Sequence, residues 1–117
     1  MKPYHANIES QTKRNSYYRK VVYTTPTMQL VLMSLRPGEE IGLERHKRTT
    51  QFIRVESGRG IAVVSGKQYK LEKDTAIMIP QNKLHNIVNT GRRALKLYTI
   101  YSPPEHPKGR RERQKRD

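Results

Sequence analysis

The sequence predicts an all-β domain, built either as a sandwich or as a barrel. Short segments rich in β-branched, aromatic and leucine residues recur along the chain at intervals of about 8 to 12 residues, which is the spacing typical of such folds. Turn residues separate these segments, and no stretch shows a helical period. At 117 residues the chain has room for one such domain with one core.

Taken in order, the elements begin with polar, aperiodic residues 1–16, which we expect to form a flexible N-terminal arm. About nine strands follow at the spacing expected of a sandwich or barrel, at 17–23, 27–35, 41–45, 51–56, 61–64, 68–71, 75–79, 84–89 and 94–101. Residues 51–56 alternate, which places Gln51, Ile53 and Val55 on one face and Phe52, Arg54 and Glu56 on the other. Ser65-Gly66-Lys67 is typical of a tight hairpin. The domain is expected to cover 17–106, and residues 107–117 to form a disordered basic tail.

The formal net charge of +14 includes two basic clusters near the ends of the chain, and the fourteen other basic residues, spread over the body, leave it basic as well. The tail contains Lys108, Arg110, Arg111, Arg113, Lys115 and Arg116, and a second cluster contains Lys13, Arg14, Arg19 and Lys20. Such a charge attracts nucleic acid, acidic partners or small anions, although solubility alone would also explain it. The tail has no interleaved aromatic residues, so it does not indicate sequence-specific reading of nucleic acid.

Some functional classes are excluded by composition. There is no cysteine, so the chain forms no disulfide and has no thiolate chemistry, which fits a reducing compartment. No apolar run approaches the roughly 20 residues that a membrane helix needs. The first residues lack the apolar core of a signal peptide. We therefore expect a cytoplasmic protein without a membrane partner.

Four polar side chains occupy strand positions that should face the interior and be apolar. Glu44 and His46 are two residues apart and so point to the same side of an extended segment. Gln51 opens the strand face shared with Ile53, and His85 begins another strand after a turn. Burying these groups is costly unless something satisfies them, and a divalent metal ion would do so. The alternative is that each is only hydrogen-bonded, or, for Glu44, paired on the surface; His5 and His106 are expected to be solvated.

The spacing of these residues resembles two motifs of the cupin family. Gly38, five residues, Glu44-x-His46, four residues, Gln51, six residues and Gly58 resemble the first motif. Asp74, five residues, Pro80-x-Asn82, two residues, His85, three residues and Asn89 resemble the second. Residues 29–35, 37–42 and 96–106 are further similar to a subgroup of small single-domain cupins, so the resemblance extends from about residue 17 to residue 107.

The resemblance implies a double-stranded β-helix, also called a jelly-roll barrel, that is usually a homodimer and holds a metal near its centre. By position, the implied ligands are Glu44, His46, Gln51 and His85. This set differs from the commonest cupin set, because Glu44 stands in place of a histidine and Gln51 in place of a glutamate. Two imidazoles and a carboxylate also make up the facial triad of non-haem iron oxygenases, and zinc, nickel, manganese and iron all stay open.

Two functions therefore stay open. The first is a metal-dependent protein that acts on or binds a small anionic or sugar-like molecule; a basic rim at Arg45, Lys47 and Arg48 favours an anion. Isomerase-like and dioxygenase-like chemistry both fit this function, and whether the protein is an enzyme is undecided. The second is a non-catalytic binding module or structural protein that uses its basic surface and tail to bind nucleic acid or an acidic partner.

Overall fold

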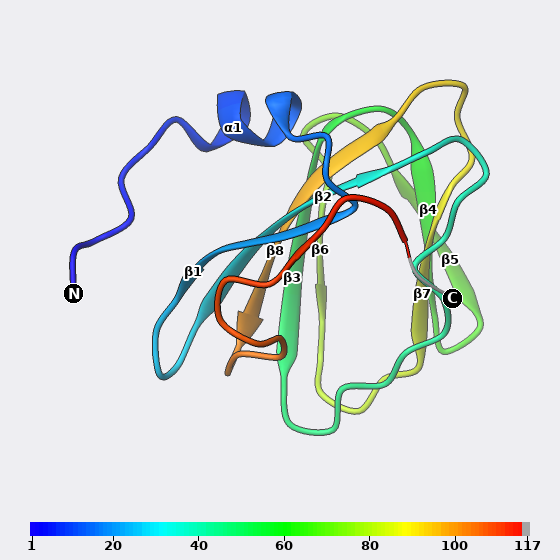
Figure 1. The fold of residues 1–117 in the computed structure, drawn as a ribbon. Coiled ribbons are helices and arrows are strands. Elements are labelled where there is room, and N and C mark those ends of the chain that lie inside the picture. The colour runs from blue at the N-terminus through cyan, green and yellow to red at the C-terminus, as the bar shows by residue number, and fades with distance from the viewer. Residues whose placement is uncertain (116–117) are drawn as a thin grey trace.

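Residues 1–115, described by the computed structural model, form nine β-strands and one short helix (Figure 1). The strands are β1 (Arg19–Thr24), β2 (Gln29–Leu35), β3 (Thr50–Ser57), β4 (Gly60–Val64), β5 (Lys67–Leu71), β6 (Ala76–Ile79), β7 (His85–Asn89), β8 (Leu95–Ser102) and β9 (Arg111–Glu112), and the helix is α1 (Ile8–Arg14). No helix within these residues is long and apolar enough to cross a membrane.

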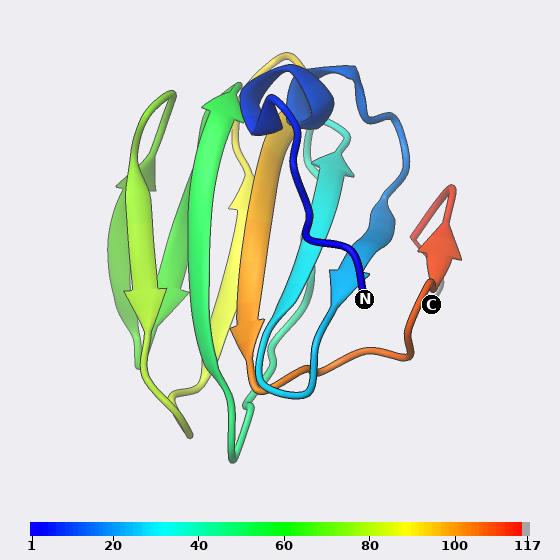
Figure 2. The same ribbon diagram turned by 90° about the vertical axis from the view of Figure 1, so that its left-hand side faces the viewer.

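The strands form two antiparallel sheets. The larger sheet has the order β6-β3-β8-β2-β1-β9 and the smaller has the order β5-β4-β7. Figures 1 and 2 show the smaller sheet facing one end of the larger one, with the chain passing repeatedly between them. This arrangement is a jelly-roll barrel, and the all-β prediction is confirmed. The predicted hairpin forms between β4 and β5 and turns at Ser65 and Gly66, which both have positive φ.

Apolar side chains fill the space between the sheets. Strand β8 alternates strictly, with Leu95, Leu97, Thr99 and Tyr101 buried and the residues between them partly exposed. In β3, Gln51, Ile53 and Val55 share the buried face, as the alternation predicts. A register shift between Val55 and Ser57 interrupts the pairing of β3 with β8. A bulge of this kind redirects a side chain, and Glu56, predicted to face outward, is buried instead.

The strand predicted at 41–45 does not form. The segment meets β7 only at two isolated bridges, Glu40 with Val88 and Glu44 with His85. Between them Gly42 adopts φ +105, a left-handed conformation that extended strands do not contain. The chain nevertheless runs antiparallel to β7 at both bridges, which keeps Glu44 beside His85.

Both ends of the chain contain more structure than predicted. Residues 1–16 include helix α1, whose first turn is capped by the side chain of Asn7, and Lys96 donates a hydrogen bond to the carbonyl of Asn15 just after the helix. Strand β9 pairs with β1, and Arg19 forms a 2.8 Å ion pair with Glu112 there. The expected disorder of the tail is therefore wrong for Arg111–Glu112, while Arg116 lies outside the described residues.

Candidate metal centre

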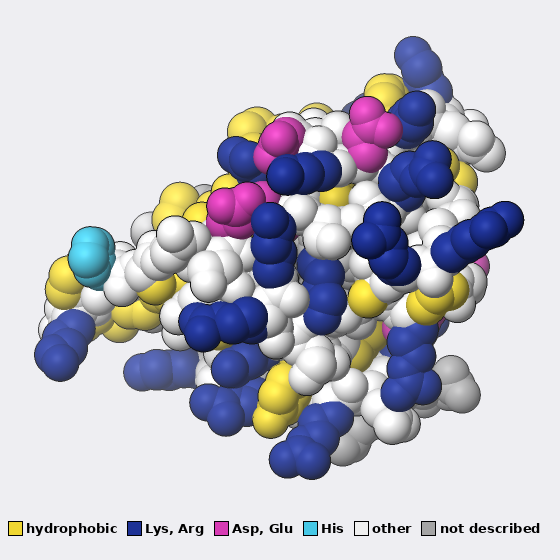
Figure 3. All heavy atoms as spheres, turned by 90° about the horizontal axis from the view of Figure 1, so that it is seen from above, with side chains coloured by type: hydrophobic (Ala, Val, Ile, Leu, Met, Phe, Trp, Pro, Cys, Tyr) yellow, Lys and Arg dark blue, Asp and Glu magenta, His cyan; other side chains and the backbone are white. Residues whose placement is uncertain are grey.

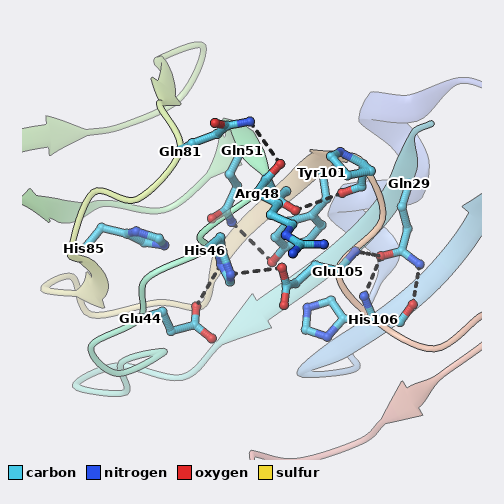
Figure 4. Close-up of polar contacts among 12 residues, drawn as sticks. Gln29, Glu44, His46, Arg48, Gln51, Gln81, His85, Tyr101, Glu105 and His106 are labelled. Atoms are coloured by element: carbon cyan, nitrogen blue, oxygen red, sulfur yellow. Dashed lines mark hydrogen bonds and ion pairs between the residues drawn. The ribbon is translucent and has the colours of Figure 1, made fainter.

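Three of the four predicted side chains meet at one end of the barrel. The candidate ligand atoms of Glu44, His46 and His85 all lie within 4.8 Å of one another (Figure 4). The backbone brings two of them together, because the amide of Glu44 donates to the carbonyl of His85 at 2.8 Å and the amide of His85 donates back at 2.9 Å. His46 follows Glu44 by two residues, so its side chain reaches the same space.

The ring of His46 is held at its Nδ1 atom. This atom lies 3.2 Å from Oε1 of Glu105, and the ring is only 8% exposed. A carboxylate at that distance favours the proton on Nδ1, which leaves the lone pair on Nε2. Nε2 is buried without a hydrogen-bond partner and lies 3.7 Å from Oε1 of Glu44.

The ring of His85 is arranged in the same way. Its Nδ1 lies 2.8 Å from the carbonyl oxygen of Lys83, and because a carbonyl only accepts, Nδ1 carries the proton. Its Nε2 is also buried without a partner. The two imidazole rings have centroids 5.1 Å apart, so both free lone pairs belong to one small space.

Gln51 contributes a carbonyl oxygen from the start of β3. Its Nε2 donates to Oγ1 of Thr99 at 3.0 Å and to Oη of Tyr101 at 3.2 Å. With both donors used, Oε1 stays buried without a partner. Figure 4 shows the Gln51 side chain extending from β3 toward His46.

The chemistry of these groups fits a cation. Two imidazole nitrogens and one amide oxygen without partners, together with a carboxylate, form an acceptor-rich site that is costly to bury without a positive charge. Nitrogen and oxygen donors of this kind are ligands of zinc, iron, manganese and nickel. The residues present can therefore hold a divalent metal ion.

Sequence reasoning missed the residues that hold His46 in place. Gln29 is fully buried; its Oε1 accepts from the backbone amides of Glu105 (3.2 Å) and His106 (3.0 Å), and its Nε2 donates to the carbonyl of His106 at 2.8 Å. These three bonds fix the segment that carries Glu105. A glutamine inside an apolar strand was the available signal, because a buried amide must find partners.

Two neighbouring groups are neutral at neutral pH. Burial lowers the pKa of His106 to about 4, and the positive charges of Arg19 and Arg110 act in the same direction. Burial also raises the pKa of Tyr101, so its hydroxyl keeps its proton. His106, expected to be solvated, is instead half-buried, and its ring packs edge-on against Tyr101 with centroids 5.1 Å apart.

The three cations of the predicted basic rim are exposed to solvent. Arg45, Lys47 and Arg48 are exposed and flank His46 in the chain. The carbonyl of Arg48 accepts a hydrogen bond from the Gln81 side chain at 3.1 Å, which joins this loop to the turn before His85. The rim is therefore attached to both segments that carry the histidines.

Comparison with known proteins gives consistent results. The family model described as "Cupin domain" matches residues 31–101. The chain is 46% identical to the uncharacterized protein YrkC of Bacillus subtilis over 92% of this chain and 61% of YrkC, and 45% identical to an uncharacterized protein of Acanthamoeba polyphaga mimivirus over 91% of this chain and 69% of that protein. It thus spans about three fifths of the length of the first relative. The chain is also similar to the crystal structure of BH2720 from Bacillus halodurans, with 44% sequence identity and a TM-score of 0.94. The match covers 96% of this chain and 89% of the BH2720 chain.

Proposed function

Because this chain belongs to the cupin family, we propose that it binds one divalent metal ion and acts on or binds a small anionic or sugar-like molecule at that ion. The ligands in this proposal are Glu44, His46, Gln51 and His85. The observation that carries it is the meeting of the candidate ligand atoms of Glu44, His46 and His85 within 4.8 Å, with Nε2 of both histidines buried and without a partner. The buried, unpartnered Oε1 of Gln51 supports a fourth ligand.

Each ligand has its own role in this proposal. His46 and His85 bind as neutral imidazoles, and Glu105 and the Lys83 carbonyl keep the proton on Nδ1. Glu44 supplies the negative charge, and Gln51 supplies a neutral oxygen held in place by Thr99 and Tyr101. A bound divalent metal would supply Lewis acidity toward an oxygen of the substrate. Isomerase-like and dioxygenase-like chemistry are both compatible with these ligands.

The substrate class follows from the charge of the rim. Arg45, Lys47 and Arg48 present three exposed cations next to the ligands, and guanidinium and ammonium groups bind carboxylate and phosphate groups. A small molecule with such a group would be held at the rim while another of its oxygens faces the ligands. The homodimer implied by the family resemblance and the cytoplasmic location both stay predictions.

The test is the metal content of protein purified without a chelator. We expect about one equivalent of metal per chain, and a rise in melting temperature when metal is added back to stripped protein, since a ligand at 100 times its Kd stabilises the fold by about 2.7 kcal/mol. His85→Ala should lose both effects, whereas His5→Ala, which alters an exposed histidine in the N-terminal segment, should keep both. Well under one equivalent together with no thermal response would refute the proposal.

The basic tail supports the alternative of a non-catalytic module that binds nucleic acid. Lys108, Arg111 and Arg113 are exposed in the described part of the tail. Deleting the tail would also remove Glu112, the partner of Arg19, so the better test replaces these three cations with glutamine. If the alternative holds, salt-dependent binding of a single-stranded oligonucleotide should collapse in this variant. Metal binding should be unchanged in it.

A further inference from the structure

A cavity lies at the opposite end of the barrel from the candidate metal centre. Its volume is about 930 Å³, and the segments that line it lie between β3 and β4, between β5 and β6, and between β7 and β8. Gln51 begins β3, whereas Glu56, near the end of that strand, lines the cavity. Five residues of extended chain separate the two sites by roughly 17 Å. None of the four proposed ligands lines this cavity.

The cavity is surrounded by positive charge. Figure 3 looks onto this end of the barrel and shows many lysine and arginine side chains on its face. Those that line the cavity are Lys13, Arg59, Lys70, Lys73, Arg92 and Arg93. Lys13 and Lys70 are paired with glutamates, but Arg59, Lys73, Arg92 and Arg93 have no carboxylate within ion-pair distance among residues 1–115. The six lining cations outnumber the two lining carboxylates, Glu56 and Glu72, and four of the cations have no ion-pair partner among the described residues, which favours an anionic ligand.

The same cavity contains a buried acceptor. Glu56 is 2% exposed, and its Oε1 has no hydrogen-bond partner, while its Oε2 lies 3.6 Å from Nε of Arg54. The bulge in β3 turns this side chain away from the outward face. A buried carboxylate oxygen without a donor is costly. An alcohol hydroxyl would satisfy it, whereas a second anionic group would be repelled.

Glycines hold the loop that carries Arg59 close to its neighbours. A Cβ on Gly58 would lie 2.4 Å from the carbonyl oxygen of Ala94, and a Cβ on Gly60 would lie 2.4 Å from that of Val88. Only glycine fits such close backbone contacts. Arg59 therefore extends from a backbone that is fixed on both sides, which reduces the entropy lost when it binds an anion.

We propose that this cavity binds a phosphorylated polyhydroxy compound, with its phosphate on Arg59, Arg92 and Arg93 and a hydroxyl donating to Oε1 of Glu56. The two features together select the class, because the cations require an anionic group and the carboxylate requires a hydroxyl. No aromatic side chain lines the cavity, so nothing there would stack a base of single-stranded nucleic acid.

The glycines give a direct readout of this site. Gly58, Gly60 and Gly91 line the cavity. Gly42 instead lies two residues before Glu44, and its amide donates to the side chain of Asn86, the residue after His85. Ribose 5-phosphate, ribose and inorganic phosphate would each be titrated into protein labelled with ¹⁵N-glycine, and the NMR resonances of the glycine amides would be followed. A chelator is present to keep metal out. Ribose 5-phosphate should shift the amide resonances of Gly58, Gly60 and Gly91 and leave that of Gly42 unchanged. Ribose alone should shift none of them.

Two variants test the assigned contacts. Arg92→Gln combined with Arg93→Gln should weaken binding of ribose 5-phosphate at least tenfold, because it removes charge-assisted hydrogen bonds to the phosphate. Lys108→Gln combined with Arg111→Gln removes the same charge from the exposed tail and should leave binding within about twofold, since distant exposed charges are screened. Glu56→Gln should weaken the binding of ribose 5-phosphate but not the binding of inorganic phosphate.

Three results would overturn the inference: no shift at the three cavity glycines, shifts centred on Gly42, or equal losses in the two double variants. Binding of an oligonucleotide at the same glycines with higher affinity than ribose 5-phosphate would also overturn it, in favour of a nucleic-acid surface. The chelator separates this result from the metal proposal, because either site can fail while the other holds.

Discussion

His46 and Glu105 form a contact that links the candidate metal centre to the segment after β8: Nδ1 of the imidazole lies 3.2 Å from Oε1 of the carboxylate. Glu105 is itself fixed, because its backbone amide donates to the buried side chain of Gln29 at 3.2 Å. The orientation of one ligand therefore depends on β2 and on the segment following β8. Neither of these lies near His46 in the chain.

The first prediction concerns this contact. Glu105→Ala removes the acceptor of the Nδ1 proton, so the ring is free to rotate and to change tautomer. Metal affinity should fall about 10- to 100-fold, which is the usual effect of losing such an outer partner. Competition against a chromophoric chelator measures it. Glu72→Ala, at an exposed carboxylate far from the site, is the matched control, and equal affinity in both variants would contradict the prediction.

The second prediction concerns Gln51, whose place is usually taken by glutamate in the family that the sequence resembles. Gln51→Glu puts a buried carboxylate beside Glu44. Without metal the free energy of unfolding of the variant should be about 1–3 kcal/mol lower than that of the wild type, because an unsatisfied buried charge is costly. With metal bound, the added charge should increase affinity, so the rise in melting temperature on metal addition should exceed that of the wild type.

Gln51→Leu is the control for this effect. It removes the candidate oxygen ligand without adding charge, so it should lower metal affinity while leaving no buried carboxylate. If Gln51→Glu responded to metal no more than Gln51→Leu, Gln51 would have no place among the ligands. Differential scanning fluorimetry with and without chelator compares the three proteins directly.

Part of the site was predictable from local periods, and the resemblance to the cupin motifs added His85. The two-residue spacing places Glu44 and His46 on one side, and the alternation of β3 turns Gln51 inward. The strand expected at 41–45 was wrong because the left-handed conformation of Gly42 interrupts it, yet the two bridges to β7 keep Glu44 beside His85. Glu105 could not be predicted as a partner, because its position depends on long-range contacts with Gln29.

The fold shows the same division between local and long-range information. Long alternating segments such as β3 and β8 carry their pattern in the sequence. Helix α1 spans seven residues, too few for a helix that is stable by itself, and it packs against β8 and β3. Strand β9 spans two residues and depends on Glu112 reaching Arg19. Short elements held by tertiary contacts give no periodic signal.

The third prediction concerns that ion pair. Arg19 and Glu112 are 8% and 7% exposed, so Glu112→Ala leaves a guanidinium almost fully buried without its main partner. The free energy of unfolding should fall by about 3–5 kcal/mol, the usual result of breaking a buried pair. Replacing both residues with apolar ones, Arg19→Met with Glu112→Leu, should recover most of this loss. Urea unfolding measures both variants, and a single-variant loss below about 1 kcal/mol would show that solvent reaches the pair.

The fourth prediction is a pH dependence that belongs to His106. Burial lowers the pKa of this imidazole from 6.5 to about 4 in the folded protein, with the positive charges of Arg19 and Arg110 adding to the effect. Between those two values the unfolded chain binds more protons than the folded one, so acid favours unfolding there. The contribution of His106 to stability is therefore complete above pH 6.5 and is lost as the pH falls toward 4. His106→Gln should flatten this part of the stability curve, whereas His5→Gln, at an exposed position, should leave it unchanged. Urea unfolding at pH 7, 6 and 5 with a chelator present compares the variants, and a curve for His106→Gln as steep as the wild-type curve would contradict the assignment of the pH dependence to His106.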